Sequence, residues 1–307
     1  MSLTIGIHDS VEAVFPPESL SEALADVDAD VRVVSGETVD CDALVTLVFH
    51  DGFLETGLEW IHSIQAGFDR FPLEALEAEG IALTNSTGIH GDTVGETVAG
   101  YMLSFARGLH RYRDRQRDGE WDRQPWDVPF SLTDSSVCVV GLGTLGQGVA
   151  VRADALGMDV VGVKRTPTPV DHVETVYPAD ELEAAIADAR FVVLTVPLNE
   201  RTEGLVGARE LDAMRPDSVL INVARGSVVE QTALVDALES DSIGGAALDV
   251  FETEPLPENS PLWGMEDVIV TPHVAAATGA YYRRIETLVR ENVKRRAAGD
   301  SLANRVV

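Results

Sequence analysis

The chain has little cysteine and no long hydrophobic run. Its 307 residues include two cysteines, Cys41 and Cys138, which provide neither a disulfide framework nor a set of zinc ligands. No apolar run approaches the roughly 18 residues that a membrane span requires. His8 and Asp9 interrupt the first apolar stretch, so no signal peptide is visible. We therefore expect a cytoplasmic protein without a metal site or a membrane partner.

Positive charge is also scarce. The chain has 51 acidic and 23 basic residues, which gives a net charge of −28, and only Lys164 and Lys294 are lysines. The acidic residues are spread along the whole sequence, which argues against a disordered acidic tail and against binding to nucleic acid or anionic membranes. Molar salt shortens the Debye length to about 3 Å and screens such self-repulsion. The composition therefore predicts a halophilic protein, and the alternative is an ordinary acidic enzyme.

A glycine-rich stretch follows the apolar run Val137–Val140. It has the pattern G-x-G-x-x-G between a predicted strand and a predicted helix, which indicates a site for a dinucleotide pyrophosphate. The first glycine allows a tight turn, the second lets the backbone approach the phosphates, and the third lets the helix pack closely. The helix N-terminus then favours the anion. The residues expected to bind the cofactor here are Gly141, Gly143, Thr144, Leu145 and Gly146.

The next predicted strand ends without the acidic residue that would bind a ribose hydroxyl. The pattern places an Asp or Glu about 20 residues after the glycines. Here the strand is followed by Lys164, Arg165 and Thr166. Two cations and a hydroxyl suit the 2′-phosphate of NADP(H), which a carboxylate would repel. We therefore expect NADP(H) to be preferred and NAD(H) to bind more weakly; the alternative is a solvated basic turn.

The first 90 or so residues alternate short apolar runs with helical stretches, which is typical of βαβ units. The predicted strands are Thr4–His8, Val31–Ser35, Ala43–Phe49, Ile61–Ala66 and Ile81–Asn85, with helices around Glu18–Ala25 and Leu73–Glu79. A capping-box pattern at Thr93–Glu96 predicts the start of a long helix, which we expect to cross between domains. Beyond it lie Trp121 and Trp126, which either form an oligomer contact or pack under their own domain.

Six apolar runs follow in the second half, and helical stretches separate several of them. They are Val137–Val140, Val160–Val163, Phe191–Val196, Val219–Val223, Ala246–Val250 and Val268–Val270. This order predicts a doubly wound parallel sheet, a Rossmann fold. Ligands of such sheets bind outside the carboxyl ends of the strands. A guanidinium, a histidine and a carboxylate follow the later strands, as hydride transfer to a 2-oxo acid requires.

Several ordered motifs resemble the D-isomer-specific 2-hydroxyacid dehydrogenases. They are Leu220–Val229, Ala247–Leu256, Val270–His273, Gln65–Asp69 and Asn85–Gly88, so the similarity spans nearly the whole chain. The resemblance implies a discontinuous flavodoxin-like α/β substrate domain formed by residues 1–92 and 277–307. It also implies a Rossmann cofactor domain at 93–276, and usually a homodimer.

The resemblance also implies roles for individual residues. Arg225 would hold the substrate carboxylate and carbonyl, His273 would act as general acid and base, and Glu254 would help His273 keep its proton. Taken alone, Arg225 could be a structural ion pair. Backbone N–H groups at Ala66 and Gly67 would bind the carboxylate. The further residues expected to contact the cofactor are Val196, Pro197, Thr202, Val223 and Asp249. Asp249 could equally orient its own loop.

We therefore expect an NADP(H)-preferring D-2-hydroxyacid dehydrogenase that runs mostly as a 2-oxoacid reductase. Glyoxylate, hydroxypyruvate and larger aliphatic 2-oxo acids are all possible substrates. The alternative is a non-catalytic dinucleotide-sensing binding protein of the same fold. The presence of Arg225, Glu254 and His273 together disfavours that alternative.

Overall fold

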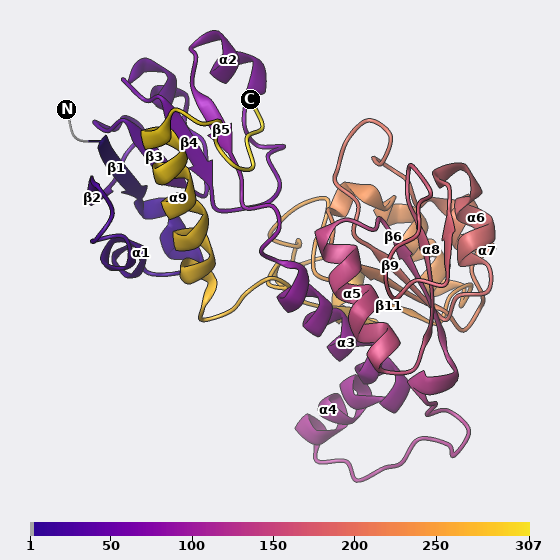
Figure 1. The fold of residues 1–307 in the computed structure, drawn as a ribbon. Helices are drawn as coiled ribbons and strands as arrows, with labels where there is room; N and C mark the ends of the chain where they lie inside the picture. The colour runs from indigo at the N-terminus through magenta and orange to yellow at the C-terminus, as the bar shows by residue number, and fades with distance from the viewer. Residues whose placement is uncertain (1–2) are drawn as a thin grey trace. The chain divides into compact units, whose positions relative to one another are not determined.

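The computed structural model describes residues 3–307, which form two compact units (Figure 1). One unit joins the described residues up to Ile89 with Ala277–Val307, and the other is His90–Ala276. The expected boundary after residue 92 therefore falls three residues earlier. The long helix α3 (Gly91–Arg107) lies wholly in the second unit, so the expectation that it crosses between domains was wrong.

The first unit has a five-stranded parallel sheet with the order β2-β1-β3-β4-β5. Its strands are β1 (Leu3–His8), β2 (Ala29–Val34), β3 (Ala43–Thr46), β4 (Trp60–Ser63) and β5 (Ala82–Thr84). The order 2-1-3-4-5 is that of flavodoxin-like folds, which confirms the predicted class of this unit. Strand β3 ends three residues before its predicted end, because the Thr46 hydroxyl donates to the carbonyl of Val48 and curls the chain.

The C-terminal segment completes this unit, as the yellow chain beside the indigo strands shows in Figure 1. Helix α9 (Tyr281–Ala298) packs on α1 (Pro17–Ala23), and the shorter α2 (Leu73–Ala78) packs near β5. The chain end then runs along β5, where Leu83 donates to Val307 and Val306 donates to Leu83. These backbone hydrogen bonds protect the edge strand.

The second unit has a seven-stranded parallel sheet with the order β12-β11-β10-β9-β6-β7-β8. Its strands are β6 (Ser136–Val140), β7 (Asp159–Val163), β8 (Thr175–Tyr177), β9 (Phe191–Leu194), β10 (Val219–Asn222), β11 (Gly245–Leu248) and β12 (Val268–Val270). Counted within the unit, this is the Rossmann order 3-2-1-4-5-6 with one further strand, which confirms the predicted fold class. Strand β8 was not predicted from the sequence; it is a half-exposed edge strand of three residues.

Helices cover both faces of this sheet. The helices of this unit are α3, α4 (Leu109–Asp118), α5 (Thr144–Ala155), α6 (Leu182–Ile186), α7 (Ala208–Ala213) and α8 (Gln231–Glu239). Alternate strand residues face opposite layers: Val137 and Val139 pack with α3 and α5, whereas Cys138 and Val140 pack with α6, α7 and α8. This alternation explains why the central strands β6 and β9 are almost wholly apolar, since residues on both faces of the sheet are buried.

The start of α3 also differs from its prediction. The N-cap is His90, and Thr93 lies inside the first turn, where its hydroxyl donates to the carbonyl of His90. The capping-box assignment at Thr93 was therefore wrong. The helix begins at Gly91. Both Gly91 and Gly95 lie directly against the backbone of α5, where a larger side chain would not fit. The helix ends at Gly108 in the left-handed conformation, and α4 follows without a loop.

Candidate active site

The glycine loop joins β6 to α5 and has the shape of a pyrophosphate cradle. Gly141 has φ 98°, which side chains disfavour, and a Cβ on Gly146 would lie 1.9 Å from the carbonyl oxygen of Gly141. A Cβ on Gly143 would meet nothing within 4 Å, so this side of the loop is open. Gly143 is also the N-cap of α5, and no side chain caps that helix. The first turn therefore presents N–H groups to an anion, and the residues present fit a dinucleotide.

Thr195, just after β9, holds this loop in place and was missed by the sequence analysis. Its buried hydroxyl lies 2.5 Å from the carbonyl oxygen of Gly141 and 3.1 Å from that of Val140. It therefore fixes the turn on which the helix N-terminus depends. The available signal was a hydroxyl within the otherwise apolar run Phe191–Val196, whose strand pairs with β6.

The basic segment after β7 lies directly beside the glycine loop. The N–H of Gly141 donates to the carbonyl of Val163 at 2.9 Å, which joins the ends of β6 and β7. Lys164 follows; its backbone donates to Tyr177 and its ammonium group to Thr168 at 3.2 Å. Arg165 and Thr166 are exposed. None of the three residues after β7 is acidic, so this end of the sheet suits a phosphate better than a ribose hydroxyl.

The loop after β9 and the residue after β10 border the same edge of the sheet. A Cβ on Gly141 would lie 2.8 Å from Cγ1 of Val196, so this loop adjoins the glycine loop. Thr202 closes the turn by donating to the carbonyl of Pro197 at 2.6 Å. Val223 donates from its backbone to Leu194 at 3.4 Å and is buried. Thr202 therefore shapes this turn through its own hydroxyl.

Arg225 stands on a loop that a buried asparagine positions. The Asn222 side chain donates to the carbonyl of Arg225 at 3.0 Å and accepts from the N–H of Ala224 at 3.1 Å. A Cβ on Gly226 would lie 1.9 Å from the carbonyl carbon of Phe251, so only glycine lets the loops after β10 and β11 touch. Arg225 itself donates to Ala224 at 2.8 Å. The close contact brings Arg225 near the loop that carries Glu254.

His273 and Glu254 form a hydrogen-bonded pair. Nδ1 of His273 lies 2.9 Å from Oε2 of Glu254, and the other carboxylate oxygen accepts from the N–H of Phe251 at 3.2 Å. With Nδ1 bonded to the carboxylate, the opposite ring nitrogen, Nε2, remains for a ligand. His273 has φ 54°, an uncommon conformation for a non-glycine residue, and both side chains are about one-third exposed. The pair can therefore exchange a proton with a bound molecule.

The buried side chain of Asp249 forms hydrogen bonds to the loop after β12, which carries His273. Its buried carboxylate accepts from the Thr271 hydroxyl at 2.6 Å and from the N–H groups of Val274 and Ala275, both at 2.8 Å. Its carbonyl accepts from the N–H of His273 at 2.8 Å. Thr271 also contacts the hydroxyl of Tyr101, whose pKa burial raises to about 12. Asp249 therefore orients the loop after β12, which carries His273, and its contact with a cofactor stays a prediction.

In the first unit, the loop after β4 directs two backbone N–H groups outward. Ser86 N–H donates to Gln65 O at 3.0 Å, and the Asn85 side chain donates to Ala66 O at 2.7 Å. Both peptide bonds are trans, so the N–H groups of Ala66 and Gly67 point the opposite way. Within residues 3–307 neither N–H has a hydrogen-bond acceptor. Two adjacent N–H groups so directed can bind a carboxylate.

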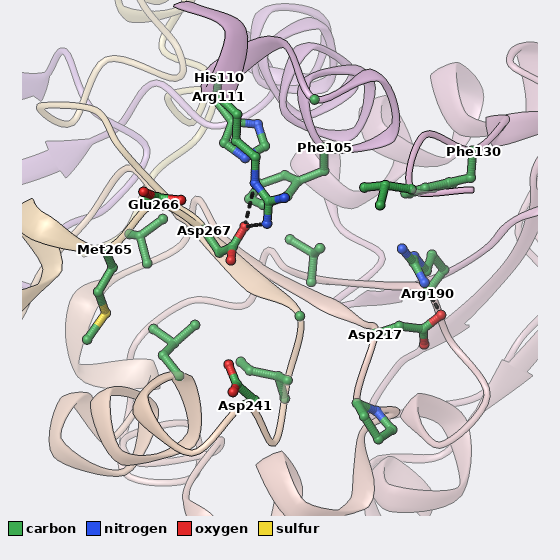
Figure 2. Close-up of a pocket in the computed structure, with 18 of the residues that line it drawn as sticks. Phe105, His110, Arg111, Phe130, Arg190, Asp217, Asp241, Met265, Glu266 and Asp267 are labelled. Atoms are coloured by element: carbon green, nitrogen blue, oxygen red, sulfur yellow. Dashed lines mark hydrogen bonds and ion pairs between the residues drawn. The ribbon is translucent and has the colours of Figure 1, made fainter. Parts of the chain in front are cut away.

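A separate hollow of about 490 Å³ lies at the amino ends of β10 and β12, opposite the end that carries His273. Figure 2 shows Arg111 paired with Asp267 and Arg190 paired with Asp217 around it. The amide of Gln124 is buried here and lacks a hydrogen-bond partner in the described chain. This hollow therefore does not belong to the site formed by the loops described above.

None of the helices in the described part of the chain is both long and apolar enough to span a membrane. No group of three or more His, Cys, Asp or Glu side chains among residues 3–307 is arranged to hold a metal ion.

The similarity to known proteins agrees with this geometry. The sequence profile of the family described as "D-isomer specific 2-hydroxyacid dehydrogenase, NAD binding domain" matches residues 99–275. The chain is 33% identical over 266 residues to glyoxylate/hydroxypyruvate reductase B of Yersinia pestis, covering 85% of this chain and 79% of that protein.

Two solved structures have nearly the same fold. An NADPH-dependent glyoxylate/hydroxypyruvate reductase of Sinorhizobium meliloti, in complex with NADP and sulfate, has a TM-score of 0.84 and 27% identity, covering 100% of this chain and 98% of that one. A D-isomer specific 2-hydroxyacid dehydrogenase of Xanthobacter autotrophicus, in complex with NADPH and MES, has a TM-score of 0.82 and 30% identity over the same shares. The chain is therefore an oxidoreductase that belongs to the D-isomer-specific 2-hydroxyacid dehydrogenase family.

Proposed function

We propose that the protein is an NADP(H)-preferring reductase of small 2-oxo acids, with His273 as the general acid. The observation that carries this proposal is the 2.9 Å contact between His273 and Glu254, on a loop that Asp249 fixes from below. A carboxylate beside an imidazole favours the protonated ring that a carbonyl oxygen needs as its acid. In the reverse direction the neutral ring takes the proton back from the hydroxy acid.

In this mechanism the chain orients the oxo acid and supplies the proton. The N–H groups of Ala66 and Gly67 bind the substrate carboxylate, and the guanidinium of Arg225 binds the carboxylate and the C2 carbonyl oxygen. His273 transfers one proton to that oxygen, and Glu254 stabilises the charged imidazole before the transfer. NADPH, when bound, supplies the hydride to C2. One hydride and one proton thus add across the carbonyl, giving the 2-hydroxy acid.

The cofactor preference rests on the segment after β7. Lys164, Arg165 and Thr166 stand beside the glycine loop, where the adenosine ribose of a dinucleotide is held in this fold. Their charge favours a 2′-phosphate, and NAD(H) lacks that group and binds more weakly. The relatives from Sinorhizobium and Xanthobacter, which were solved with NADP and NADPH, support the same choice. Glyoxylate and hydroxypyruvate, the substrates in the names of two relatives, are the first to test here.

We further propose a homodimer formed by the second unit. Trp121 and Trp126 are 97% and 93% exposed, so they do not pack under their own domain. They belong to a segment that ends beside the hollow of Figure 2, to which Val128 and Phe130 also contribute. Two exposed indoles on a segment that also lines a hollow are typical of a contact between chains, because aromatic residues are enriched at such contacts.

The decisive experiment measures NADPH oxidation by a panel of 2-oxo acids. The reaction is monitored as the loss of NADPH absorbance in the near ultraviolet. The panel runs from glyoxylate and hydroxypyruvate to larger aliphatic 2-oxo acids, in parallel with NADH. Because the charge of −28 suggests adaptation to high salt, each assay is repeated from low to molar salt. Tight NADPH binding without turnover of any member would contradict the reductase and favour a dinucleotide sensor.

A further inference from the structure

A chain of buried hydrogen bonds runs beneath the loop that follows β4. It begins at Trp60, whose indole N–H donates to the Thr84 hydroxyl at 2.8 Å. That hydroxyl lies 2.8 Å from Nδ1 of His62, and Nε2 of His62 lies 3.2 Å from the Ser86 hydroxyl. Ser86 in turn donates to the carbonyl of Ser63 at 2.9 Å. All five residues are at most 1% exposed, so water does not replace any of these partners.

These contacts favour one arrangement of protons. Ser86 has one hydroxyl proton, which the carbonyl of Ser63 accepts, so Nε2 of His62 carries a proton and donates it to the Ser86 oxygen. The Thr84 oxygen already accepts from Trp60, and its own proton points to Nδ1 at 2.8 Å in preference to the carbonyl of Ile61 at 3.5 Å. The imidazole is therefore neutral. Burial lowers the pKa of His62 to about 3, so it keeps this state across the whole working range of pH.

The chain ends at the loop with the outward N–H groups. Four consecutive carbonyls of this loop each accept a hydrogen bond. The pairs are Ser63 with the Ser86 hydroxyl, Ile64 with the Tyr281 hydroxyl at 2.8 Å, Gln65 with the Ser86 N–H, and Ala66 with the Asn85 side chain. Ser86 supplies two of the four bonds: its hydroxyl, which His62 contacts, bonds to Ser63, and its backbone N–H bonds to Gln65. The carbonyls of Gln65 and Ala66 set the directions of the N–H groups of Ala66 and Gly67, because each peptide unit is planar. His62 therefore acts on these N–H groups through the position of Ser86.

We propose that His62 is a positioning residue for substrate binding, which acts through Ser86 on the loop at Ala66 and Gly67. This inference rests on the proposed function, in which that loop binds the substrate carboxylate. It assigns to a buried neutral histidine the alignment of N–H groups that it does not itself contact. Because such alignment serves substrate and transition state alike, its loss raises KM and leaves kcat nearly unchanged.

Two substitutions separate the two ends of the imidazole. His62→Asn places an amide where Nδ1 stands and loses the contact with Ser86, whereas His62→Gln reaches the position of Nε2 and keeps a donor to Ser86. We expect His62→Asn to raise KM for the 2-oxo acid about tenfold or more, which is the loss of a charged hydrogen bond. Its kcat and its KM for NADPH stay close to the wild type, and His62→Gln restores most of the loss. Ser86→Ala, which breaks the same link from the other side, reproduces the rise.

His8→Asn is the matched control, since His8 is also buried in the first unit but bonds to Gly36 and Ser10 instead. Hydrogen exchange of the peptide that contains residues 63–67 gives a readout independent of turnover. Exchange there should quicken in His62→Asn and Ser86→Ala but not in His8→Asn. If these variants keep the wild-type KM and exchange, or lose kcat and NADPH affinity equally, the positioning role is wrong. If the wild type reduces no 2-oxo acid but the exchange pattern holds, the proposed function alone fails.

Discussion

At the scale of single residues, the hydrogen bond between Glu254 and His273 is the contact with the most direct kinetic consequence. Replacing Glu254 with Gln keeps the shape but removes the charge beside the ring. The imidazolium that donates the proton then loses a charged hydrogen-bond partner, so kcat for reduction should fall about tenfold to a hundredfold, while the KM for NADPH stays close to the wild type. The measurement is kcat and KM for NADPH-dependent reduction. Glu252→Gln is the control, because Glu252 bonds to the backbone of Gln231 instead; an unchanged kcat in the Glu254 variant would refute the pairing.

A second prediction at this scale concerns the cofactor. The double variant Lys164→Asp with Arg165→Ala should bind NADPH about tenfold to a hundredfold more weakly, as expected for the loss of charged hydrogen bonds to the 2′-phosphate. NADH should suffer far less, because the new carboxylate can accept its free ribose hydroxyl. The decisive quantity is the ratio of kcat/KM for the two cofactors. Lys294→Asp changes the other lysine, on α9, and should leave this ratio alone. A wild type that already prefers NADH would overturn the assignment.

The site residues that could be predicted from the sequence are those whose position along the chain is informative by itself. Arg225, Glu254 and His273 stand just beyond apolar runs, so their positions at the carboxyl ends of strands were predictable. Thr195 and His62 were not, because each looks like one polar residue in a buried strand until its partners are known. Those partners, Gly141 and Ser86, are distant in sequence, and a single chain read in order does not reveal such contacts.

At the scale of elements, the buried central strands were predictable, but a short edge strand and the start of a helix were not. Strand β6 begins one residue before its predicted start and ends at the predicted residue, since a buried strand is a continuous apolar run. Strand β8 was missed because it is short, half-exposed and paired on one side. The start of α3 was misjudged because Thr93 and Glu96 match a capping box, whereas the helix begins earlier, at Gly91. That residue serves packing between helices, which local propensity does not encode.

The packing of α3 on α5 provides a prediction at this scale. A Cβ on Gly148 would lie 2.0 Å from the carbonyl oxygen of Gly91, so the backbones of the two helices nearly touch. Gly148→Ala should therefore lower the free energy of unfolding by about 1–3 kcal/mol, because the helices must separate. Gly100→Ala is the control on α3, where the added methyl meets nothing within 4 Å and should stabilise by about 0.5–1 kcal/mol. Thermal or denaturant unfolding measures the stability of both variants. If Gly148→Ala is as stable as Gly100→Ala, the two helices separate at little energetic cost.

At the scale of the whole molecule, the net charge of −28 dominates the dependence on salt. Repulsion among 51 carboxylates destabilises the folded chain most where screening is weakest. The melting temperature should therefore rise as the chloride salt increases from roughly 0.1 M to several molar. Sucrose serves as the control, because it favours compact states without screening charge. A melting temperature that stays flat or falls with salt would show that the acidity is not an adaptation to salt.

The same net charge also bears on the proposed dimer, because it opposes the association of two copies. Two chains of this charge repel each other, so a stable dimer needs apolar contacts and should tighten as salt is added. Trp121 and Trp126 are the most exposed large apolar side chains that the structure describes, and we expect them to supply those contacts. Replacing both with Ala should therefore convert a dimer into a monomer in molar salt, as measured by sedimentation or light scattering. Trp263→Ala is the matched control, since that indole is 55% exposed and donates to Pro257 of its own chain. A double variant that remains dimeric would place the interface elsewhere, and a wild type that is monomeric at every salt concentration would exclude the dimer itself.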